Sequence, residues 1–312
     1  MQFPFSLLQN KEFDVTGFGT NAVDYLIQVP EYPAFNSKVE LTDYVQAAGG
    51  EVATAMAGLR RLGIRASYIG RFGSDEAGDF GFQSLIDEGV GLEYAERIEG
   101  ARTQIAFIVI DVRNGERTVI WQRDVKLAYS KTEVPLAAIA KTSVVHLTPH
   151  DTEACLELAR EAGKLGVIVS TDIDRVFDGI EDLLAHVDIM ICSADFPNSL
   201  LGIGDHKLAL KEMRSRFGCG IVGVTLGKEG SLLLCGETFI RTPGFEVPNG
   251  CKDTTGAGDS FRVGLLYGLL TGETVEESAR MANAVAALKC RAIGARTALP
   301  AKNELEDFLN GK

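Results

Sequence analysis

The sequence predicts an α/β fold with a central, mostly parallel sheet, and two observations support this prediction. Short runs that are apolar at nearly every position alternate with amphipathic stretches through the middle and the C-terminal half of the chain. Such runs are typical of strands covered on both faces, and their alternation with helices produces parallel β-α-β units. The 312 residues are 46% hydrophobic and include 34 glycines against 9 prolines, which suits a large core with many tight turns.

The expected elements follow one another without a linker or an internal repeat. We expect strands at 143–148, 167–171, 188–192 and 220–225. We expect helices at 151–165, near 180–186, and at 208–217. These features predict one domain over residues 1–312 rather than two equal halves.

Two segments interrupt this rhythm, at about 36–48 and 101–123. Both alternate as strands do, and neither is followed by a crossover helix of its own. The dipeptide Asn114-Gly115 suits a type I′ hairpin turn, because it tolerates positive φ angles. We therefore expect a small antiparallel sheet that covers a site as a lid does. Its exposed apolar face favours pairing with a second copy of the chain, which predicts a homodimer.

Charge and cysteine usage exclude several classes of protein. The chain has 31 basic and 43 acidic side chains, a formal charge of −12, which argues against a nucleic-acid-binding protein. A local phosphate site remains compatible with this charge, because glycine-rich loops and helix N-termini bind anions through backbone amides. The six cysteines are scattered without zinc-ligand spacing, as expected of buried thiols in a reducing compartment. Without a leader-like start or a long apolar run, we expect a cytoplasmic protein with no membrane partner.

The most informative segment is Asp253-Thr254-Thr255-Gly256-Ala257-Gly258-Asp259-Ser260-Phe261, followed by an apolar run at 263–270. The small residues lie where a loop becomes the N-terminus of a buried helix. Free N–H groups there can stabilise a phosphoryl group in transfer. Asp259, in the first helical turn, can accept a proton from an attacking hydroxyl. Alternatively, Asp253 or Asp259 only caps the helix and the glycines only allow close packing.

This segment resembles the C-terminal signature of the ribokinase-like (PfkB) family of carbohydrate kinases. Three further motifs are similar to those of that family and occur in its order. Gly49-Gly50 resembles its N-terminal glycine pair, and the stretch at 69–78 resembles its G-x-x-G-x-D-x-x-G continuation. The stretch at 224–230 is similar to its strand and turn beside the nucleotide. The resemblance covers nearly the whole chain.

The resemblance implies a three-layer α/β sandwich with a lid, ATP as phosphoryl donor and Mg²⁺. It implies phosphorylation of a hydroxyl, expected to be a primary one, of a small sugar or polyol. Asp259 would be the catalytic base, and Gly256, Ala257 and Gly258 would form the anion hole. The family's nucleotide-binding positions correspond to Thr225, Gly227, Gly230, Thr255 and, near adenine, Asn283.

On the sugar side, the resemblance assigns Asp24 to binding hydroxyls, with Gly49 and Gly50 allowing close approach. A carboxylate suits a polyol because it accepts two hydroxyl hydrogen bonds at once. Thr54 stands where many members have asparagine and is a candidate sugar contact. Arg123, after the lid, is a candidate for reaching the substrate, although a solvated charge at a strand end is the alternative.

The cation sites depart from the family pattern. The N-x-x-E motif that the family associates with metal and phosphates is missing after 188–192. Asp195 and Asp174 are the candidates for holding Mg²⁺ in its place. Asp253 and the segment 291–298 resemble the family's monovalent-cation loop, but Ala298 replaces a hydroxyl residue, so activation by K⁺ is left open.

Three alternatives remain beside a general sugar kinase. Two segments, 193–195 and 114–120, look closer to the ketohexokinase branch, which would imply fructose as substrate. A catalytically silent sugar- or nucleotide-binding relative is the second. The third is a dinucleotide-dependent oxidoreductase, because residues 17–22 fit the G-x-G-x-x-A fingerprint. Against it, that fingerprint must be followed by a helix, whereas residues 23–29 look like a strand.

Overall fold

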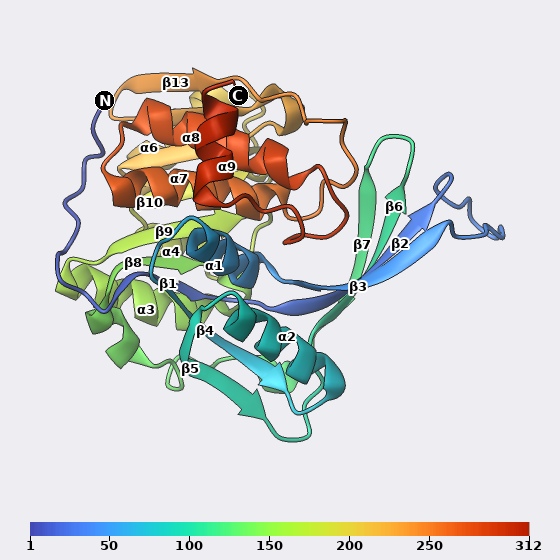
Figure 1. The fold of residues 1–312 in the computed structure, drawn as a ribbon. Coiled ribbons are helices and arrows are strands. Elements are labelled where there is room, and N and C mark those ends of the chain that lie inside the picture. The colour runs from blue at the N-terminus through green and yellow to red at the C-terminus, as the bar shows by residue number, and fades with distance from the viewer. Residues whose placement is uncertain (312) are drawn as a thin grey trace.

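A nine-stranded sheet forms the middle layer of the protein (Figure 1). The computed structural model describes residues 1–311. The order across the sheet is β13 (Thr238–Thr242), β12 (Ser231–Cys235), β11 (Ile221–Thr225), β10 (Ile189–Ser193), β9 (Ile168–Ile173), β8 (Thr142–Leu147), β1 (Phe13–Phe18), β4 (Ala66–Gly73) and β5 (Gly91–Ile98). All neighbours are parallel except β11–β12 and β12–β13. The expected parallel sheet is thereby confirmed.

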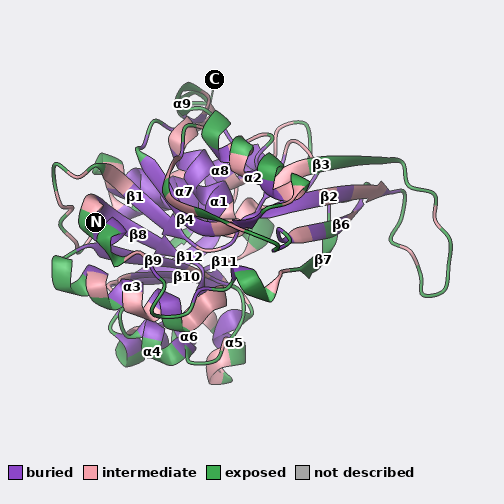
Figure 2. Ribbon diagram, turned by 90° about the horizontal axis from the view of Figure 1, so that it is seen from below, coloured by how far each residue is buried: buried purple, intermediate pink, exposed green. Residues whose placement is uncertain are grey.

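Helices cover both faces of this sheet, as Figure 2 shows. One face carries α1 (Glu51–Arg61), α2 (Glu76–Asp87), α7 (Ala257–Thr271), α8 (Val275–Lys289) and α9 (Lys302–Leu309). The other carries α3 (Thr152–Leu165), α4 (Ile180–Leu184), α5 (Phe196–Leu201) and α6 (His206–Phe217). Side chains alternate along each strand, so that Ile189 and Ile191 enter the first core while Met190 and Cys192 enter the second. The fully apolar runs in the sequence follow from this burial on both faces.

A small four-stranded sheet projects from the large one (Figure 2). Its order is β3 (Asp43–Gly49), β2 (Ala22–Val29), β6 (Ile105–Asp111) and β7 (Arg117–Gln122). The two outer pairings are antiparallel, as expected, and β2 adds a strand that runs parallel to β6. Because β2 follows 17–22 directly, no helix opens there, and the dinucleotide fingerprint lacks the structure it requires.

The turn between β6 and β7 differs from the expected type I′ turn. Gly115 has φ of 74°, but Asn114 is not among the residues with positive φ. Asp111 O accepts hydrogen bonds from the amides of both Asn114 (3.3 Å) and Gly115 (2.9 Å). The side chain of Asn114 accepts from the Glu116 amide instead (2.8 Å). The prediction was wrong because a longer loop places only the glycine in the left-handed region.

Local signals set several helix ends. Asp75, Asp205 and Thr274 each accept a hydrogen bond from a first-turn amide of α2, α6 and α8, respectively. All six cysteines are free thiols, and five of them are buried. Within residues 1–311, no helix is long and apolar enough to cross a membrane.

Candidate active site

A cavity of about 470 Å³ lies where the carboxyl ends of the parallel strands meet the inner face of the small sheet. Ligands of open α/β sheets bind at such an edge. The segments that line it are far apart in the sequence. They contribute Thr20, Ala22, Asp24, Gly50, Glu51, Gln104, Ala106, Ile108, Arg117, Val119, Trp121, Pro149, His150, Asp172, Asp174, Arg175, Phe177, Ser193, Thr225, Thr255, Gly256, Gly258, Asp259, Arg262 and Ala295.

The N-terminus of α7 opens onto this cavity. Gly256 is its N-cap residue with φ of 76°, and a Cβ added there would lie 2.8 Å from the Cβ of Ala295, so the position requires glycine. The Ala257 amide donates to Thr254 O (3.1 Å). Among residues 1–311, the amides of Gly258 and Asp259 have no backbone acceptor in the preceding loop. They form the free donors of an anion-binding helix end.

Asp259 lies beside this helix end, half-buried and close to other carboxylates. Burial raises its pKa well above the ordinary value, and the charges of Asp172 and Glu51 raise it further. Arg262, one turn later on α7, opposes this effect. A carboxyl group with a raised pKa is a stronger proton acceptor once it is ionised, which suits a general base.

A buried ion pair anchors the first turn of α7 to the large sheet. Arg262 is 2% exposed, and its Nη2 lies 2.5 Å from Asp172 Oδ1 at the end of β9. The same guanidinium donates to Gly258 O (3.0 Å) and to Ile191 O (3.1 Å). Burial raises the pKa of Asp172, whereas the charge of Arg262 lowers it. The pair therefore fixes the anion-binding turn relative to the strand ends.

The opposite wall of the cavity carries Glu51, the first residue of α1. Glu51 Oε2 lies 3.2 Å from His150 Nε2, and Arg175 Nη2 lies 3.4 Å from His150 Nδ1. Burial favours the neutral form of Glu51, but the hydrogen bond and charge of His150, with the charge of Arg175, bring its pKa below the usual value. Burial and the Glu51 charge raise the pKa of Asp174. The site is thus predominantly acidic.

The carboxylates of this wall bear on metal binding. Within residues 1–311, no three His, Cys, Asp or Glu side chains converge closely enough to hold a metal ion by themselves. Mg²⁺ in phosphoryl-transfer sites keeps several waters and is held by one or two carboxylates together with substrate phosphates. Glu51, Asp172 and Asp174 supply the hard oxygen donors that such a shared site needs.

Asp24 lies at the far end of the cavity, on β2. It is 4% exposed, and among the described residues its carboxylate accepts no hydrogen bond. A Cβ on Gly49 would overlap this carboxylate, which explains why glycine is needed there. Burial raises the pKa of Asp24 to about 6, although the nearby charge of Arg296 lowers it. An unpaired buried carboxylate facing a cavity is ready to accept hydroxyl donors.

Several predicted residues do not line the cavity, and three require correction as direct contacts. Thr54 is fully buried, and its hydroxyl accepts from Arg296 Nε (3.3 Å). Arg123 pairs with Asp151 (2.7 Å) and donates to Leu127 O, so it does not point to a substrate. Asp195 is exposed before α5 and does not line the cavity, although Ser193, two positions earlier, does.

The remaining predicted residues, those expected to contact the nucleotide, differ in whether they line the cavity. Thr225 and Thr255 line the cavity, and the buried Thr255 Oγ1 has no hydrogen-bond partner within residues 1–311. Gly227 and Gly230 form the turn after Thr225 with positive φ angles. Asn283 is 5% exposed and donates to Ser231 Oγ and Ala279 O, both at 3.0 Å. The structure therefore uses the Asn283 amide group to join α8 to β12.

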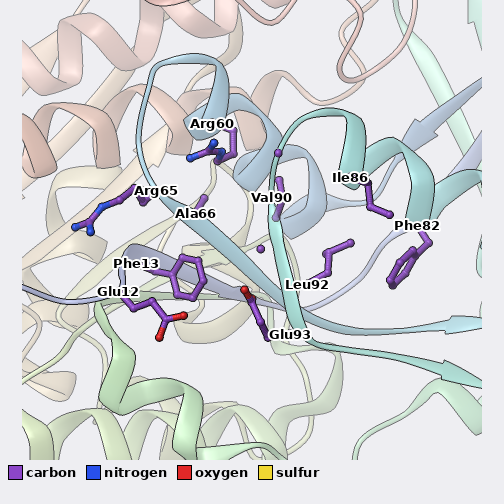
Figure 3. A pocket seen from close by; sticks show the side chains of 12 residues that line it. Glu12, Phe13, Arg60, Arg65, Ala66, Phe82, Ile86, Val90, Leu92 and Glu93 are labelled. Carbon is purple, nitrogen blue, oxygen red and sulfur yellow. The ribbon is translucent and has the colours of Figure 1, made fainter.

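A second hollow, of about 530 Å³, lies away from these residues, beside α2 and the starts of β4 and β5 (Figure 3). Two arginines border it, but each has a partner within the protein. Arg65 pairs with Asp14 (2.6 Å), and Arg60 donates to Ile64 O (3.1 Å). None of the predicted site residues lies there, so we do not assign it a role in the chemistry.

The structure adds site residues that sequence reasoning missed. Glu51 on α1 and Asp172 on β9 approach the first turn of α7, Arg262 lies on α7 itself, and Arg117 and Trp121 face the cavity from β7. Asp172 and Glu51 each had a signal in the sequence, because each stands at the end of a recognised motif or strand run. Arg262 stands between Phe261 and the apolar run at 263–270, and a charged residue at the start of such a run suggests a buried partner.

A covered cavity with free helix-end amides beside a carboxylate base has the parts required for phosphoryl transfer to a hydroxyl. The family model for pfkB family carbohydrate kinases matches residues 18–302, and the chain belongs to this family. It is therefore a carbohydrate kinase, which transfers a phosphoryl group from ATP to a sugar or a related molecule. The expected family and fold are confirmed.

Two relatives and one solved structure show the extent of this similarity. An ATP-dependent ribose-1-phosphate kinase of Halopiger xanaduensis is 29% identical, covering 92% of this chain and 95% of its own. A nucleoside kinase of Methanothermobacter thermautotrophicus is 28% identical, covering 95% of both. The crystal structure of a candidate ribokinase from Agrobacterium tumefaciens aligns with a TM-score of 0.88 at 26% identity, covering 96% of this chain and 98% of its own.

Proposed function

We propose that Asp259 and the N-terminus of α7 transfer the γ-phosphoryl group of ATP to an acceptor hydroxyl held by Asp24. The hydroxyl oxygen forms the new bond to the γ-phosphorus, and the bond from that phosphorus to the β,γ-bridging oxygen breaks. The hydroxyl proton passes to an Asp259 carboxylate oxygen, and ADP leaves. The free amides at Gly258 and Asp259, the observation that carries this proposal, would stabilise the transferring group.

The raised pKa of Asp259 supports its role as the base. Burial, followed by the negative charges of Asp172 and Glu51, favours a proton on this residue, so its affinity for the acceptor proton is high. Arg262 donates to Gly258 O in the same helical turn and pairs with Asp172, which holds this turn in place relative to the end of β9. Arg262 is therefore a positioning residue in this proposal.

The acceptor would lie with its polyol end on Asp24 and its remainder along the inner face of the small sheet. This inner face is largely apolar, with Ala106, Ile108 and Val119 beside Trp121. Gly50, which lines the cavity, would let the acceptor approach the backbone at the Asp24 end, and Gly49 leaves room for the Asp24 carboxylate. The names of the two relatives make molecules with a pentose ring the first acceptors to test, and a primary hydroxyl would approach phosphorus with least steric hindrance. Fructose is the acceptor that a ketohexokinase-like activity would require.

Thr225, Thr255 and the turn with Gly227 and Gly230 would contact the nucleotide, and Mg²⁺ would enter with its phosphates. When bound, the ion would neutralise charge on those phosphates. Glu51, Asp172 and Asp174 are better placed to hold it than Asp195, because they line the same cavity as Asp259. Burial raises the pKa values of Asp172 and Asp174, and the neighbouring carboxylate charges raise them further; a cation would reduce that repulsion.

We further propose that the small sheet forms a lid on one kinase domain and pairs two copies of the chain. Strand alternation places Tyr25, Ile27, Tyr44, Phe107 and Ile120 on the outer face, away from Asp24. Tyr44 is 66% and Ile120 59% exposed. These five side chains carry no charge, and Asp111, at the end of β6 on the same face, is paired with Arg113. In a chain of formal charge −12, this face is where two copies can approach with little repulsion. The six free thiols support a reducing, cytoplasmic setting.

The first experiment measures ADP release with MgATP over a panel of ribose, ribose 1-phosphate, nucleosides, fructose, other sugars and sugar acids. We expect acceptor-dependent ADP formation with at least one pentose compound. Preference for fructose over all pentoses would favour the ketohexokinase-like alternative. A nicotinamide-dependent absorbance change without ATP would instead favour an oxidoreductase.

The second experiment replaces the base by Asp259→Asn, with Asp178→Asn at an exposed position as control. The kcat of the site variant should fall by about 10²–10⁴-fold, because its amide cannot accept the proton. Binding can be followed separately, because Trp121 is the only tryptophan and lines the cavity. A kcat within a factor of about two of wild type would refute the assignment. A Trp121 response to sugars with no ADP release in the wild type would identify a silent binding protein.

A further inference from the structure

A lysine and an aspartate form a fully enclosed pair directly behind the anion-binding loop. The side chains of Lys289 and Asp253 are both 0% exposed. Lys289 Nζ donates to Asp253 O (2.8 Å) and lies 3.6 Å from Asp253 Oδ2. Burying an ammonium group is unfavourable unless it is paired and hydrogen-bonded, so the contacts of Lys289 with Asp253 must offset the cost of burying it.

Asp253 connects two loops through its two carboxylate oxygens. Oδ1 accepts from the Thr255 amide, and Oδ2 accepts from the Gly294 amide, both at 2.8 Å. The first contact shapes the loop that leads into Gly256. The second joins that loop to the segment containing Ala295, whose side chain faces Gly256 closely. The position of the anion-binding turn therefore depends on Asp253.

Lys289 supplies the positive charge that this junction needs. It is the last residue of α8, where the partial negative charge of the helix end also favours a cation. Burial lowers the pKa of Lys289, and the charge of Asp253 opposes that change. The Lys252 amide donates to Cys290 O (2.8 Å), so the chain around both members of the pair is held in place.

A monovalent metal ion does not fit the same place. Such an ion must exchange its water shell for several oxygen ligands. Here, both Asp253 carboxylate oxygens accept backbone amides, and the Asp253 carbonyl oxygen accepts from Lys289. Ala298 offers no hydroxyl group, and a second cation would be repelled by the ammonium. The expectation that Asp253 takes part in a monovalent-cation site therefore does not match the structure.

We propose that the ammonium group of Lys289 takes the place of a bound monovalent cation. It holds the Asp253–Gly256 loop in the conformation that presents the amides at the start of α7, and it makes the kinase independent of K⁺. The proposal rests on the proposed function, because the loop it positions is the proposed anion hole. Lys289 is a positioning residue, since it touches neither the cavity nor the reacting atoms. Its loss should therefore reduce kcat more than it changes the KM for the acceptor.

The test compares wild type with Lys289→Ala in KCl, NH₄Cl and tetramethylammonium chloride at equal ionic strength. Wild-type kcat should differ by less than about twofold among these salts. The kcat of Lys289→Ala should fall by about 10-fold or more in tetramethylammonium chloride, and K⁺ or NH₄⁺ should restore part of it by entering the vacated space. Lys164→Ala, which removes an exposed lysine in the last turn of α3, should resemble wild type.

Thermal unfolding without substrate gives a readout independent of activity. K⁺ and NH₄⁺, but not tetramethylammonium, should raise the Tm of Lys289→Ala and leave that of wild type unchanged. Strong K⁺ activation of the wild type would overturn the proposal, as would a Lys289→Ala protein with wild-type kcat. If Lys289→Ala does not fold, the wild-type salt series and Lys289→Met decide the question. If no acceptor supports ADP release, the proposed function fails, whereas the unfolding comparison still tests the cation.

Discussion

Replacing Asp24 by asparagine should make the protein more stable while removing acceptor binding. In the folded protein, burial raises the pKa of this carboxyl from 3.8 to about 6. That difference corresponds to on the order of 3 kcal/mol of unfavourable free energy when the group is ionised. The cost arises because the buried carboxylate accepts no hydrogen bond from the described residues, and the attraction of Arg296 is partly opposed by the negative charge of Asp253. Asparagine removes the charge at almost the same volume.

The direction of this pKa shift determines how the stability difference between wild type and Asp24→Asn changes with pH. Between about pH 4 and pH 6, the folded protein retains an Asp24 proton that the unfolded chain has released. The free energy of unfolding of the wild type therefore falls through this window as the pH rises, relative to Asp24→Asn. The two proteins should be nearly equal at pH 4. The variant should be the more stable above pH 6, by up to about 3 kcal/mol, less the lost attraction to Arg296.

The assay is urea unfolding at several pH values between 4.5 and 7.5, together with acceptor titrations followed by Trp121 fluorescence. Asp24→Asn should bind the acceptor at least about 100-fold more weakly, because it replaces two hydrogen-bond acceptors of a charged group by one. Asp178→Asn, at an exposed position, provides the matched control. A variant that is less stable than wild type at pH 7, or an unfolding difference that does not change with pH, would refute the reasoning.

Three further predictions concern the helix end, the charge cluster and the lid. Gly256→Ala should lower kcat by about 100-fold or more and lower the free energy of unfolding in urea by about 1–3 kcal/mol. The reason is that residue 256 has φ of 76° and the added Cβ would collide with Ala295. A fully active variant would contradict this prediction. Asp172→Asn should lower the pKa of Asp259 by removing a repelling charge, so the acidic limb of the kcat–pH profile should shift to lower pH, whereas an upward shift would oppose the charge argument. The double variant Phe107→Glu with Ile120→Glu should have a mass of 33.6 kDa by light scattering, whereas the wild type should have twice that mass. The control Val125→Glu changes an exposed residue outside the small sheet and should remain dimeric. A monomeric wild type would rule out the proposed pairing.

Features encoded by neighbouring residues could be predicted from the sequence. The helix beginning after Gly256 and the position of Asp259 in its first turn depend on local backbone geometry, and both are as expected. The parallel strands were equally accessible, because burial on both faces leaves continuous apolar runs. The turn at Asn114-Gly115 shows the limit, since loop length decided which residue took the positive φ.

Contacts between distant segments could not be predicted in the same way. Thr54 looked available for a sugar, but its hydroxyl accepts from Arg296, 242 positions later in the chain. Lys289 follows an alanine-rich helical stretch and would ordinarily be placed at the surface, because lysine is seldom fully buried. Its burial depends on Asp253, which lies 36 positions earlier. A single sequence carries no signal for such pairs.

The acidic character of the site limits which groups can bind the phosphates of the nucleotide. Asp24, Glu51 and Asp259 would each repel a nucleotide triphosphate, and a formal charge of −12 gives no long-range attraction. Besides Arg117, which lines the cavity, phosphate recognition therefore relies on neutral donors with a fixed direction, the amides at the start of α7, and on the charge that Mg²⁺ brings with the nucleotide. Fixed donors act only if the loop before them is rigid. Two charge pairs beside the start of α7 meet that requirement. Lys289 and Asp253 are fully enclosed, and in the pair of Arg262 with Asp172 the side chains are only 3% and 13% exposed, so solvent screens either pair little.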